Sequence, residues 1–315
     1  MPVEIPVETY KGKIRELTIG AGDKALKIGG ETTMPFYSFE GEMPNSPKIA
    51  VEVYDEVEGW SDWAVEPYKD VINDPAAWAK KAVSEHKAQA ITLQLKSTDP
   101  NGTDASGDDA AKTVENVLNA IDVPLIVYGS GNVEKDEDVL KKVAAAANGK
   151  NIAMGPAQED NYKTVAAAAM GYGHKVIAMS PVDINIAKQL NILITQLGVS
   201  ADSIIMDPTT GALGYGLEYT YTIMERLRLA ALQQSDEMTS MPIICNLGYE
   251  VWRTKETRVN AEEEPTWGDP KTRSVLWETV TATSLLLAGA DILVMRHPEA
   301  IAQLGNLIAD LSKQA

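Results

Sequence analysis

The stretch SIIMDPTTG (203–211) decides the fold: a short apolar run that ends in a small, polar turn before a helical segment. Seven other runs follow the same pattern, namely IAVEVYD (49–55), AITLQLKS (90–97), PLIVYGS (124–130), NIAMGPAQ (151–158), KVIAMSP (175–181), PIICNLGYE (242–250) and DILVMRHP (291–298). Apolar runs of this length without clean alternation are typical of parallel strands buried on both faces. Eight of them, most followed by a helix, predict an α/β protein with a closed (β/α)8 TIM barrel.

Capping signals place the helices between these runs. Asn73-Asp74-Pro75, Asp108, Asp183 and Asp269-Pro270 each offer an N-cap ahead of an apolar-periodic stretch, and His297-Pro298 does the same for the last one. The expected helices cover residues 75–87, 108–121, 136–147, 160–172, 183–197, 217–234, 271–288 and 298–313.

The first 48 residues form an extension to the barrel. Residues 13–28 predict a β-hairpin around Gly20, Gly22 and Asp23, and such a hairpin commonly closes the amino-terminal end of a barrel. Residues 29–48 are rich in Gly, Pro and Ser and indicate a crossing loop. We therefore expect residues 1–48 as hairpin and loop and residues 49–315 as the barrel, within a single domain.

Composition excludes several classes of protein. A net charge of −17 and a pI near 4.6 argue against nucleic acid, because binding to phosphates depends on Lys and Arg. The stretch from Thr279 to Ala290 is too short to span a bilayer, and the first twenty residues alternate charged and apolar positions, unlike a signal peptide. We expect a cytoplasmic protein that has neither a nucleic-acid nor a membrane partner.

Cysteine and histidine are scarce. Cys245 is the only cysteine, so the chain can form no internal disulfide and cannot by itself hold a four-iron cluster. Its three histidines show no HxH or HExxH spacing, so no zinc site is expected. His86 is expected to be solvated, His174 to lie on the stability side of the barrel, and His297 to cap the last helix.

Barrels of this class work at the carboxyl ends of their strands, so the residues that follow each run are the candidates for a site. The densest cluster is MDPTTGALGYG (206–216). Asp207 can accept hydrogen bonds from a bound amide or ring nitrogen, while Thr209, Thr210 and Gly211 begin a loop whose backbone can approach a flat ligand. The alternative is a plain turn in which the aspartate bonds locally.

Two other strand ends offer neutral polar groups. Asn246 and Tyr249 follow the seventh run and suit recognition without charge, and Ser130 and Asn132 follow the third. The alternative for each is a role in the rim or turn itself. No pair of strand-end carboxylates is placed for acid–base work, so we predict no catalytic residue and no metal ligand in this chain.

Charged side chains stand at two further strand ends, those of Lys96 and Arg296. Lys96 is at the position that a Schiff-base lysine would occupy. The polar Ser-Thr-Asp that follows it indicates exposure to solvent, which favours an ordinary surface lysine. Arg296 closes the last strand, where barrels often bind phosphate.

Long loops at this end carry tryptophan beside charge. Residues 55–74 contain Trp60 and Trp63, and residues 251–270 contain Trp267. Tryptophan in a charged loop indicates either a partner surface or packing onto the barrel rim, and if a partner binds, these loops are the candidates for contact with it.

Four segments carry a family resemblance: PKIAVEVYDE (47–56), LIVYGSGN (125–132), MDPTTGALGYG (206–216) and PIICNLGYE (242–250). They resemble the small subunit of the corrinoid iron–sulfur protein of the reductive acetyl-CoA pathway, and the likeness extends over nearly the whole chain.

The resemblance implies a non-catalytic barrel subunit of a methyl carrier. It implies a large subunit that holds a [4Fe-4S] cluster and a cobamide, with the cobamide lying between the large subunit and the open end of this barrel. The assembly would take a methyl group from methyltetrahydrofolate through a methyltransferase and deliver it to acetyl-CoA synthase. By their strand-end positions, Asp207, Thr209, Thr210, Gly211, Asn246, Tyr249, Ser130 and Asn132 are the expected cobamide contacts.

Two other functions fit the barrel. A pterin-dependent methyltransferase would use Asp207 and Asn246 on the pterin, although no second well-placed carboxylate is evident. A lyase or aldolase would use Lys96.

Overall fold

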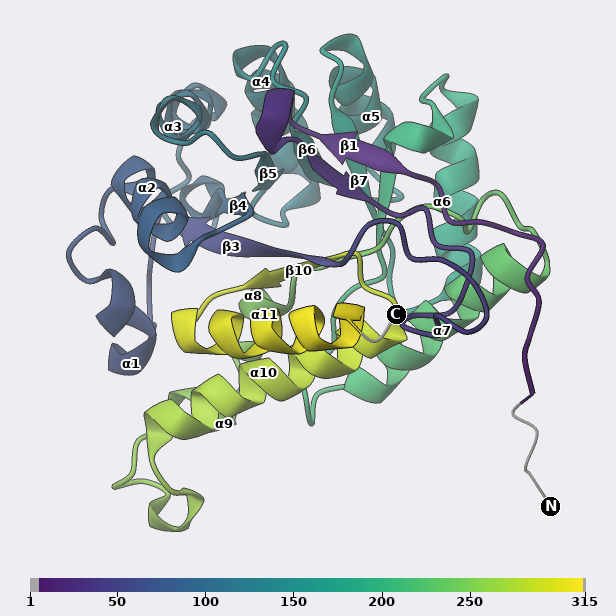
Figure 1. Cartoon of the computed structure of the whole chain (residues 1–315). Coiled ribbons are helices and arrows are strands. Elements are labelled where there is room, and N and C mark those ends of the chain that lie inside the picture. Colours follow the sequence, from purple (N-terminus) through teal and green to yellow (C-terminus); the bar gives the residue numbers. More distant parts are fainter. Residues whose placement is uncertain (1–5, 314–315) are drawn as a thin grey trace, which may run out of the picture.

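Eight parallel strands form the centre of the computed structural model, which describes residues 6–313 (Figure 1). They are β3 (Lys48–Tyr54), β4 (Ala90–Gln94), β5 (Leu125–Tyr128), β6 (Ala153–Ala157), β7 (Lys175–Met179), β8 (Ile204–Asp207), β9 (Ile244–Cys245) and β10 (Ile292–Met295). The sheet order is β8-β7-β6-β5-β4-β3-β10-β9. A parallel bridge between Met206 and Ile243 joins the two ends of the sheet and closes the predicted barrel.

Helices surround this barrel and agree with the expected ranges to within a few residues. The long ones are α2 (Pro75–His86), α3 (Gly107–Ala120), α4 (Val133–Ala146), α5 (Tyr162–Gly171), α6 (Ile184–Gln196), α7 (Leu217–Gln233), α10 (Pro270–Ala288) and α11 (Pro298–Lys313). Three of the predicted aspartate caps act as caps: Asp74 accepts hydrogen bonds from the backbone N–H groups of Ala76 and Ala77, Asp183 from those of Asn185 and Ile186, and Asp269 from that of Thr272. The prediction for Asp108 is wrong, because Ser106 caps α3 and Asp108 lies within its first turn.

Short helices lie in the loops at the carboxyl ends of the strands: α1 (Asp62–Val65), α8 (Leu247–Val251) and α9 (Lys255–Arg258). The seventh predicted run, 242–250, is a strand only at Ile244–Cys245, because the chain turns directly into α8. Within residues 6–313, every helix is too short or too polar to cross a membrane.

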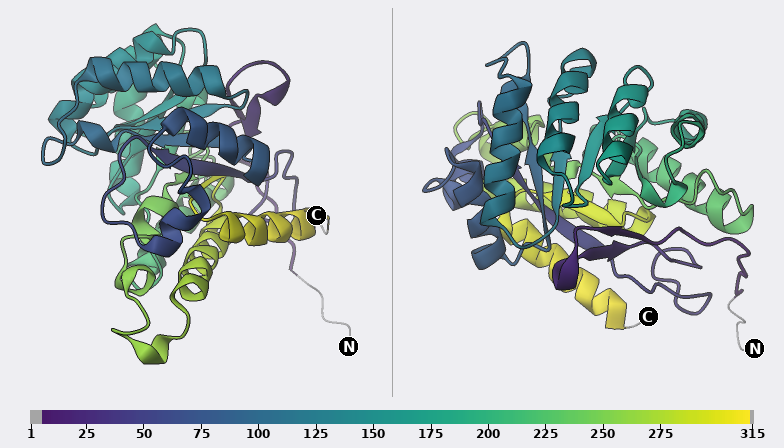
Figure 2. Two further views of the ribbon diagram at one scale, coloured as in Figure 1. Left: turned by 90° about the vertical axis from the view of Figure 1, so that its left-hand side faces the viewer. Right: turned by 90° about the horizontal axis from the view of Figure 1, so that it is seen from above.

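The N-terminal hairpin closes one end of the barrel (Figure 2). It consists of β1 (Leu17–Ile19) and β2 (Leu26–Ile28), paired antiparallel. Its four buried side chains form one cluster with inward-pointing residues at the amino-terminal ends of the barrel strands: Leu17, Ile19, Leu26 and Ile28 with Ala50, Ala90, Ile126, Ala153, Ile177, Ile205, Ile244 and Ile292. The predicted hairpin is therefore present and fills the amino-terminal end with apolar side chains. Residues 1–5 and 314–315, at the outer limits of the expected segments, lie outside the described residues.

Inward-pointing residues become polar toward the opposite end. Successive side chains of a strand point to opposite faces, so Ala50, Glu52 and Tyr54 of β3 all face the interior. The same alternation turns Gln94 and Tyr128 inward near the ends of β4 and β5. The barrel interior thus changes from an apolar base to a polar mouth.

A buried charge cluster fixes the amino-terminal base. Arg228 of α7 forms an ion pair with Asp291, which precedes β10, and both are nearly inaccessible to solvent. Glu31, from the segment after the hairpin, lies beside this pair with its Oε2 unpartnered. Burial and the neighbouring Asp291 raise the pKa of Glu31 to about 8. One arginine thus faces two carboxyl groups, and Glu31 keeps its proton at neutral pH.

Replacing Glu31 with glutamine is expected to stabilise the protein at alkaline pH. The folded chain holds a proton that the unfolded chain releases above its ordinary pKa of 4.5, so the free energy of unfolding falls as the pH rises from about 4.5 to about 8. Glutamine mimics the protonated acid and removes this fall. Urea unfolding at pH 5 and pH 8.5 should show E31Q gaining about 4 kcal/mol over the native chain between the two pH values. Parallel pH profiles for the two proteins would contradict the assignment.

Candidate functional site

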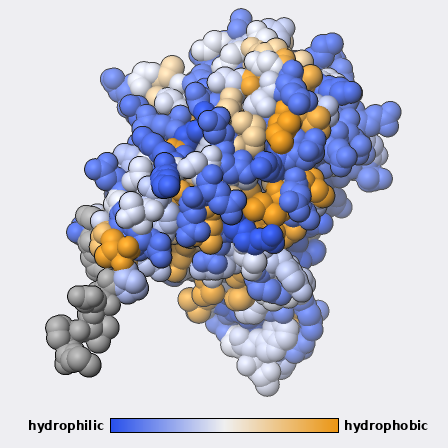
Figure 3. All heavy atoms as spheres, turned by 90° about the vertical axis from the view of Figure 1, so that its right-hand side faces the viewer, coloured by the Kyte–Doolittle hydropathy of each residue, from blue (hydrophilic) through white to orange (hydrophobic). Residues whose placement is uncertain are grey.

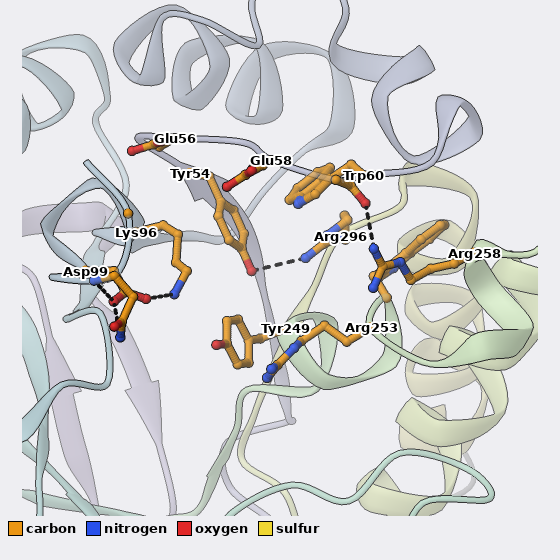
Figure 4. A pocket seen from close by; sticks show the side chains of 14 residues that line it. Tyr54, Glu56, Glu58, Trp60, Lys96, Asp99, Tyr249, Arg253, Arg258 and Arg296 are labelled. Carbon is orange, nitrogen blue, oxygen red and sulfur yellow. Dashed lines mark hydrogen bonds and ion pairs between the residues drawn. The ribbon is translucent and has the colours of Figure 1, made fainter. Parts of the chain in front are cut away.

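Two adjoining pockets open at the carboxyl ends of the strands. The Asp207 pocket is lined by Gln94, Lys96, Tyr128, Gly129, Ser130, Gly131, Pro156, Met179, Asp207, Thr209, Thr210, Asn246, Tyr249 and Glu250. The Arg296 pocket is lined by Tyr54, Glu56, Glu58, Gly59, Trp60, Lys96, Asp99, Asn101, Gly102, Tyr249, Trp252, Arg253, Arg258 and Arg296 (Figure 4). Because Lys96 and Tyr249 line both pockets, the two form one continuous surface across the mouth.

Asp207 is held in place at the end of β8. Its Oδ2 accepts a hydrogen bond of 2.8 Å from the phenol of Tyr128, and its Oδ1 accepts one of 3.0 Å from the backbone N–H of Thr209. Burial raises the pKa of Asp207 to about 6, although both hydrogen bonds favour the carboxylate. Burial also raises the pKa of Tyr128 well above its usual value, so its hydroxyl stays protonated and donates.

Two neutral amides line the same pocket as this carboxylate. Gln94 Nε2 donates to Asn246 Oδ1 over 2.8 Å, which orients both side chains. Thr210 is 6% exposed, and its Oγ1 has no oxygen or nitrogen partner within residues 6–313. A buried hydroxyl is costly unless it is paired, and Thr210 has only the weakly bonding thiol of Cys245 beside it.

The 206–216 loop closes on itself. Thr209 has a positive φ of 61° and donates its hydroxyl to the Ser180 carbonyl over 2.6 Å. A Cβ on Gly211 would lie 2.5 Å from the backbone of Gly216, and Thr220 binds Gly211 N–H. The close approach that requires glycine at position 211 is therefore made by the loop itself, and Gly211 does not line either pocket.

The loop after β5 is organised by a buried acid. Asp136 of α4 is fully buried, and its carboxylate accepts hydrogen bonds from the backbone N–H and hydroxyl of Ser130 and from the N–H of Gly131. Ser130 is thereby presented to the Asp207 pocket. The side chain of Asn132 instead caps α4 by accepting from Lys135 N–H, so the structure does not bring it to either pocket.

Arg296 forms the wall of the second pocket. It is 3% exposed and ion-paired with the fully buried Glu52, and it donates to the hydroxyl of Tyr54 over 3.1 Å. Its guanidinium carbon lies 3.5 Å from the ring centroid of Trp60, a close cation–π contact. Because its charge is already balanced by Glu52, Arg296 is committed to the wall and is not free for a phosphate.

Glu278 of α10 anchors the chain just beyond this wall. It accepts hydrogen bonds from the backbone N–H groups of Arg296 and His297 and from Trp252 Nε1. Burial raises the pKa of Glu278 to about 7 and lowers that of His297 to about 4. The neutral His297 accepts from Glu299 N–H at Nδ1, and so caps α11 as expected.

No histidine lines either pocket. His174 is buried on the outer side of the barrel, with Nε2 2.9 Å from the Ala144 carbonyl. His86 is not solvated as expected: it is half-buried, its Nε2 is shielded from solvent, and its ring meets Tyr68 edge-on. Cys245 is fully buried, with its Sγ 3.7 Å from the sulfur of Met224. Among residues 6–313 there is no group of three or more His, Cys, Asp or Glu that could hold a metal ion.

Lys96 and the tryptophans of the long loops are engaged within the chain. Lys96 Nζ lies 2.5 Å from Asp99 Oδ2, as expected of a surface lysine. Trp63 donates to the Thr257 carbonyl, and Trp267 lies under the cation of Lys255. With Trp60 against Arg296, all three rings are half-buried at the rim, and their contact with a partner stays a prediction.

Three important mouth residues escaped the sequence interpretation. They are Glu52, Gln94 and Tyr128, which belong to the apolar runs themselves. The residues predicted for the site lie at or after the ends of these runs. Each of the three missed residues is a polar residue at the carboxyl-terminal part of its strand: Glu52 lies two positions before the end of β3, and Gln94 and Tyr128 are the last residues of β4 and β5. In a buried parallel strand such an interruption is the available signal for a side chain that points into the mouth.

A family model described as CO dehydrogenase/acetyl-CoA synthase delta subunit matches residues 16–309. The chain belongs to this delta-subunit family. It is 41% identical to acetyl-CoA decarbonylase/synthase complex subunit delta 1 of Methanosarcina thermophila, over 93% of this chain and 67% of that protein. It is 39% identical to subunit delta of Archaeoglobus fulgidus, over 96% of this chain and 70% of that protein. The resemblance to the small corrinoid iron–sulfur subunit, and the expectation of a subunit of an acetyl-CoA complex, are thus confirmed.

Solved structures similar to this delta-family chain share its fold. Dihydropteroate synthase from Xanthomonas albilineans with 4-aminobenzoic acid has a TM-score of 0.60 at 12% identity, covering 88% of this chain and 98% of that one. The enzyme from Vibrio fischeri has a TM-score of 0.59 at 14% identity, covering 95% and 99%. At these identities the likeness establishes the barrel and carries no substrate over to this family member.

Proposed function

We propose that the mouth of this barrel covers a cobamide held by a larger, corrinoid-carrying subunit of the same complex. The single observation that carries the proposal is the surface formed by the two adjoining pockets, which is broad, largely neutral in the Asp207 pocket and free of histidine. The same assembly would include the large subunit's [4Fe-4S] cluster, a methyltetrahydrofolate methyltransferase and acetyl-CoA synthase as partners.

The donor set of the mouth fits the periphery of a corrin ring, which carries several amide side chains. Ser130, Thr210 and Tyr249 offer hydroxyl groups that can donate or accept, and the oriented Gln94–Asn246 pair offers amide atoms. Thr210 meets a test of fit, because its Oγ1 has no oxygen or nitrogen partner among the described residues and an amide that reached it would supply one. When bound, a cobamide supplies a cobalt centre that accepts and gives up a methyl group.

The chain's own residues would hold and shield such a ligand. Thr210 and Asn246 would bind amides, and Ser130 would do so from the loop that Asp136 fixes. Trp60 and Tyr249 present rings that exclude water from the mouth. Since no imidazole or thiolate reaches the mouth, these residues offer no strong ligand that would block the cobalt face turned toward them.

The pterin-dependent methyltransferase fits the geometry less well. Both oxygens of Asp207 already accept hydrogen bonds, from the hydroxyl of Tyr128 and from the backbone N–H of Thr209. The carboxylate that would have to recognise a pterin is thus already engaged within the chain.

Alanine at Thr210 and at Asn246 tests the cover. In the complex reconstituted with the corrinoid-carrying subunit, the double variant is expected to lose cobamide on gel filtration or to oxidise Co(I) about 3- to 10-fold faster. This corresponds to the loss of about 1 kcal/mol of hydrogen bonding, the contribution of one typical hydrogen bond. Visible absorption measures both effects.

The matched control is Thr222→Ala, which removes an exposed hydroxyl that bonds only within α7. It should behave as the native chain. Native retention and native oxidation rates in the Thr210/Asn246 variant would remove both residues from the site. Micromolar binding of methyltetrahydrofolate to the isolated chain would favour the enzyme instead.

A further inference from the structure

An apolar groove runs from the rim of the mouth along α6. The α6 groove lies between this helix and the loop after β6, and its apolar lining is Met179, Val182, Ile186, Leu190 and Leu193. Val182 and Ile186 are 36% and 38% exposed, and they line this groove together, so that they contribute to one apolar patch. Figure 3 shows the side of the molecule where α6 and α7 lie, with apolar patches among charged atoms.

The spacing on α6 is that of a helix-contact face. Ile186, Gln189, Leu190 and Leu193 are at positions i, i+3, i+4 and i+7 and all line the groove. The ring of helices is looser here, since α6 packs less closely against α5 than α3 does against α4. Such a face is typical of a groove in which an amphipathic helix of a partner binds.

The groove is continuous with the proposed cofactor cover. Met179 and Thr209 line both the α6 groove and the Asp207 pocket. A segment seated in the groove would therefore reach the edge of the ligand surface. Because of this continuity, we take the segment from the subunit that would hold the ligand over the mouth.

The charge of the rim defines the chemistry of the occupant. Glu159 and Asp160 are the charged residues that line the groove, both are exposed, and neither forms an ion pair within the described part of the chain. A second copy of this chain fits poorly, because its net charge of −17 repels and a symmetric contact would bring the same carboxylates together. An apolar segment that carries Lys or Arg fits both the floor and the rim.

We propose that the α6 groove docks an amphipathic, Lys- or Arg-bearing helix of the corrinoid-carrying subunit. The inference rests on the proposed function, since it takes the occupant from the subunit that this function requires. It adds a contact on the barrel flank that holds this subunit in register with the mouth.

Ile186→Asp tests the groove, and Leu197→Asp is its matched control. Both residues are 38% exposed, but Ile186 lies in the first turn of α6 and Leu197 just after its last. In titration of the full chain with the purified corrinoid-carrying subunit, I186D should bind about 30-fold more weakly, as for the loss of an interface hot spot. L197D should bind within about twofold of the native chain, as expected of a site outside such a hot spot. The double variant Glu159→Lys with Asp160→Lys should also weaken binding, and the effect should shrink as salt is raised.

The outcomes separate the groove from the cover. Native affinity of I186D, with faster Co(I) oxidation still seen in the Thr210/Asn246 variant, would overturn the groove and leave the cover standing. A native chain that sediments as a dimer, and as a monomer when Ile186 is aspartate, would overturn the assignment of the occupant. If the native chain fails to bind the corrinoid-carrying subunit at all, both proposals fall.

Discussion

Replacing Arg296 with methionine is expected to destabilise the barrel by about 3–5 kcal/mol, because it leaves the Glu52 carboxylate buried without its cation. Burial already raises the pKa of Glu52 even with Arg296 present. Without the arginine the folded chain would hold the Glu52 proton over a wider pH range, so the variant's deficit should be smaller at pH 5 than at pH 8. Urea unfolding at the two pH values measures both effects.

The double variant Glu52→Gln with Arg296→Met separates lost charge from lost packing. It removes the pair together, so most of the stability should return, although the contact of Arg296 with Trp60 is still lost. If the double variant is as unstable as R296M alone, the ion pair is not the source of the loss. In that case stacking against the tryptophan would have to account for it.

Replacing Asp136 with alanine is expected to cost about 2–4 kcal/mol, because its carboxylate accepts two backbone hydrogen bonds and one from a hydroxyl. The loop from Gly129 to Asn132 would lose its internal support, and Ser130 would no longer be fixed at the Asp207 pocket. Thermal unfolding and amide hydrogen exchange at residues 129–132 measure the two consequences.

Gly129 provides a matched test of that geometry. A Cβ at this position would overlap the Asp136 carboxylate, so Gly129→Ala alone should destabilise the chain. In the double variant that combines Gly129→Ala with Asp136→Ala, the new methyl group at position 129 can occupy the space that the Asp136 carboxylate leaves. We therefore expect the double variant to be at least about 1 kcal/mol more stable than the sum of the two single effects. Simple additivity would mean that the two groups do not meet.

The barrel could be predicted from the sequence because each of its elements carries its own local signal. Continuous apolar runs marked the strands, and N-caps such as Asp74 and Asp269 marked helix starts within a few residues. The seventh strand was the least accurate, since α8 begins only two residues after Cys245. Its boundary depends on how the loop packs against the rest of the mouth, which no local pattern records.

The candidate site was predictable where it depends on strand position and not where it depends on loop direction. Asp207, Thr210, Asn246 and Tyr249 line the Asp207 pocket because the ends of parallel strands meet at one edge. Asn132 follows a strand just as they do, yet its amide caps α4. Which way a side chain turns beyond its strand is decided by its hydrogen-bond partners, and for Asn132 that partner is the first turn of the next helix.

The hairpin of β1 and β2 fills one end of the barrel with four tightly packed aliphatic side chains. Because side chains fill the interior from this base upward, oxygen and water can approach a ligand at the mouth only across the rim. A partner that covered the mouth would therefore have to exclude them along this one circumference. The N-terminal strands, although far from the mouth, thus help to decide from which side a bound ligand needs protection.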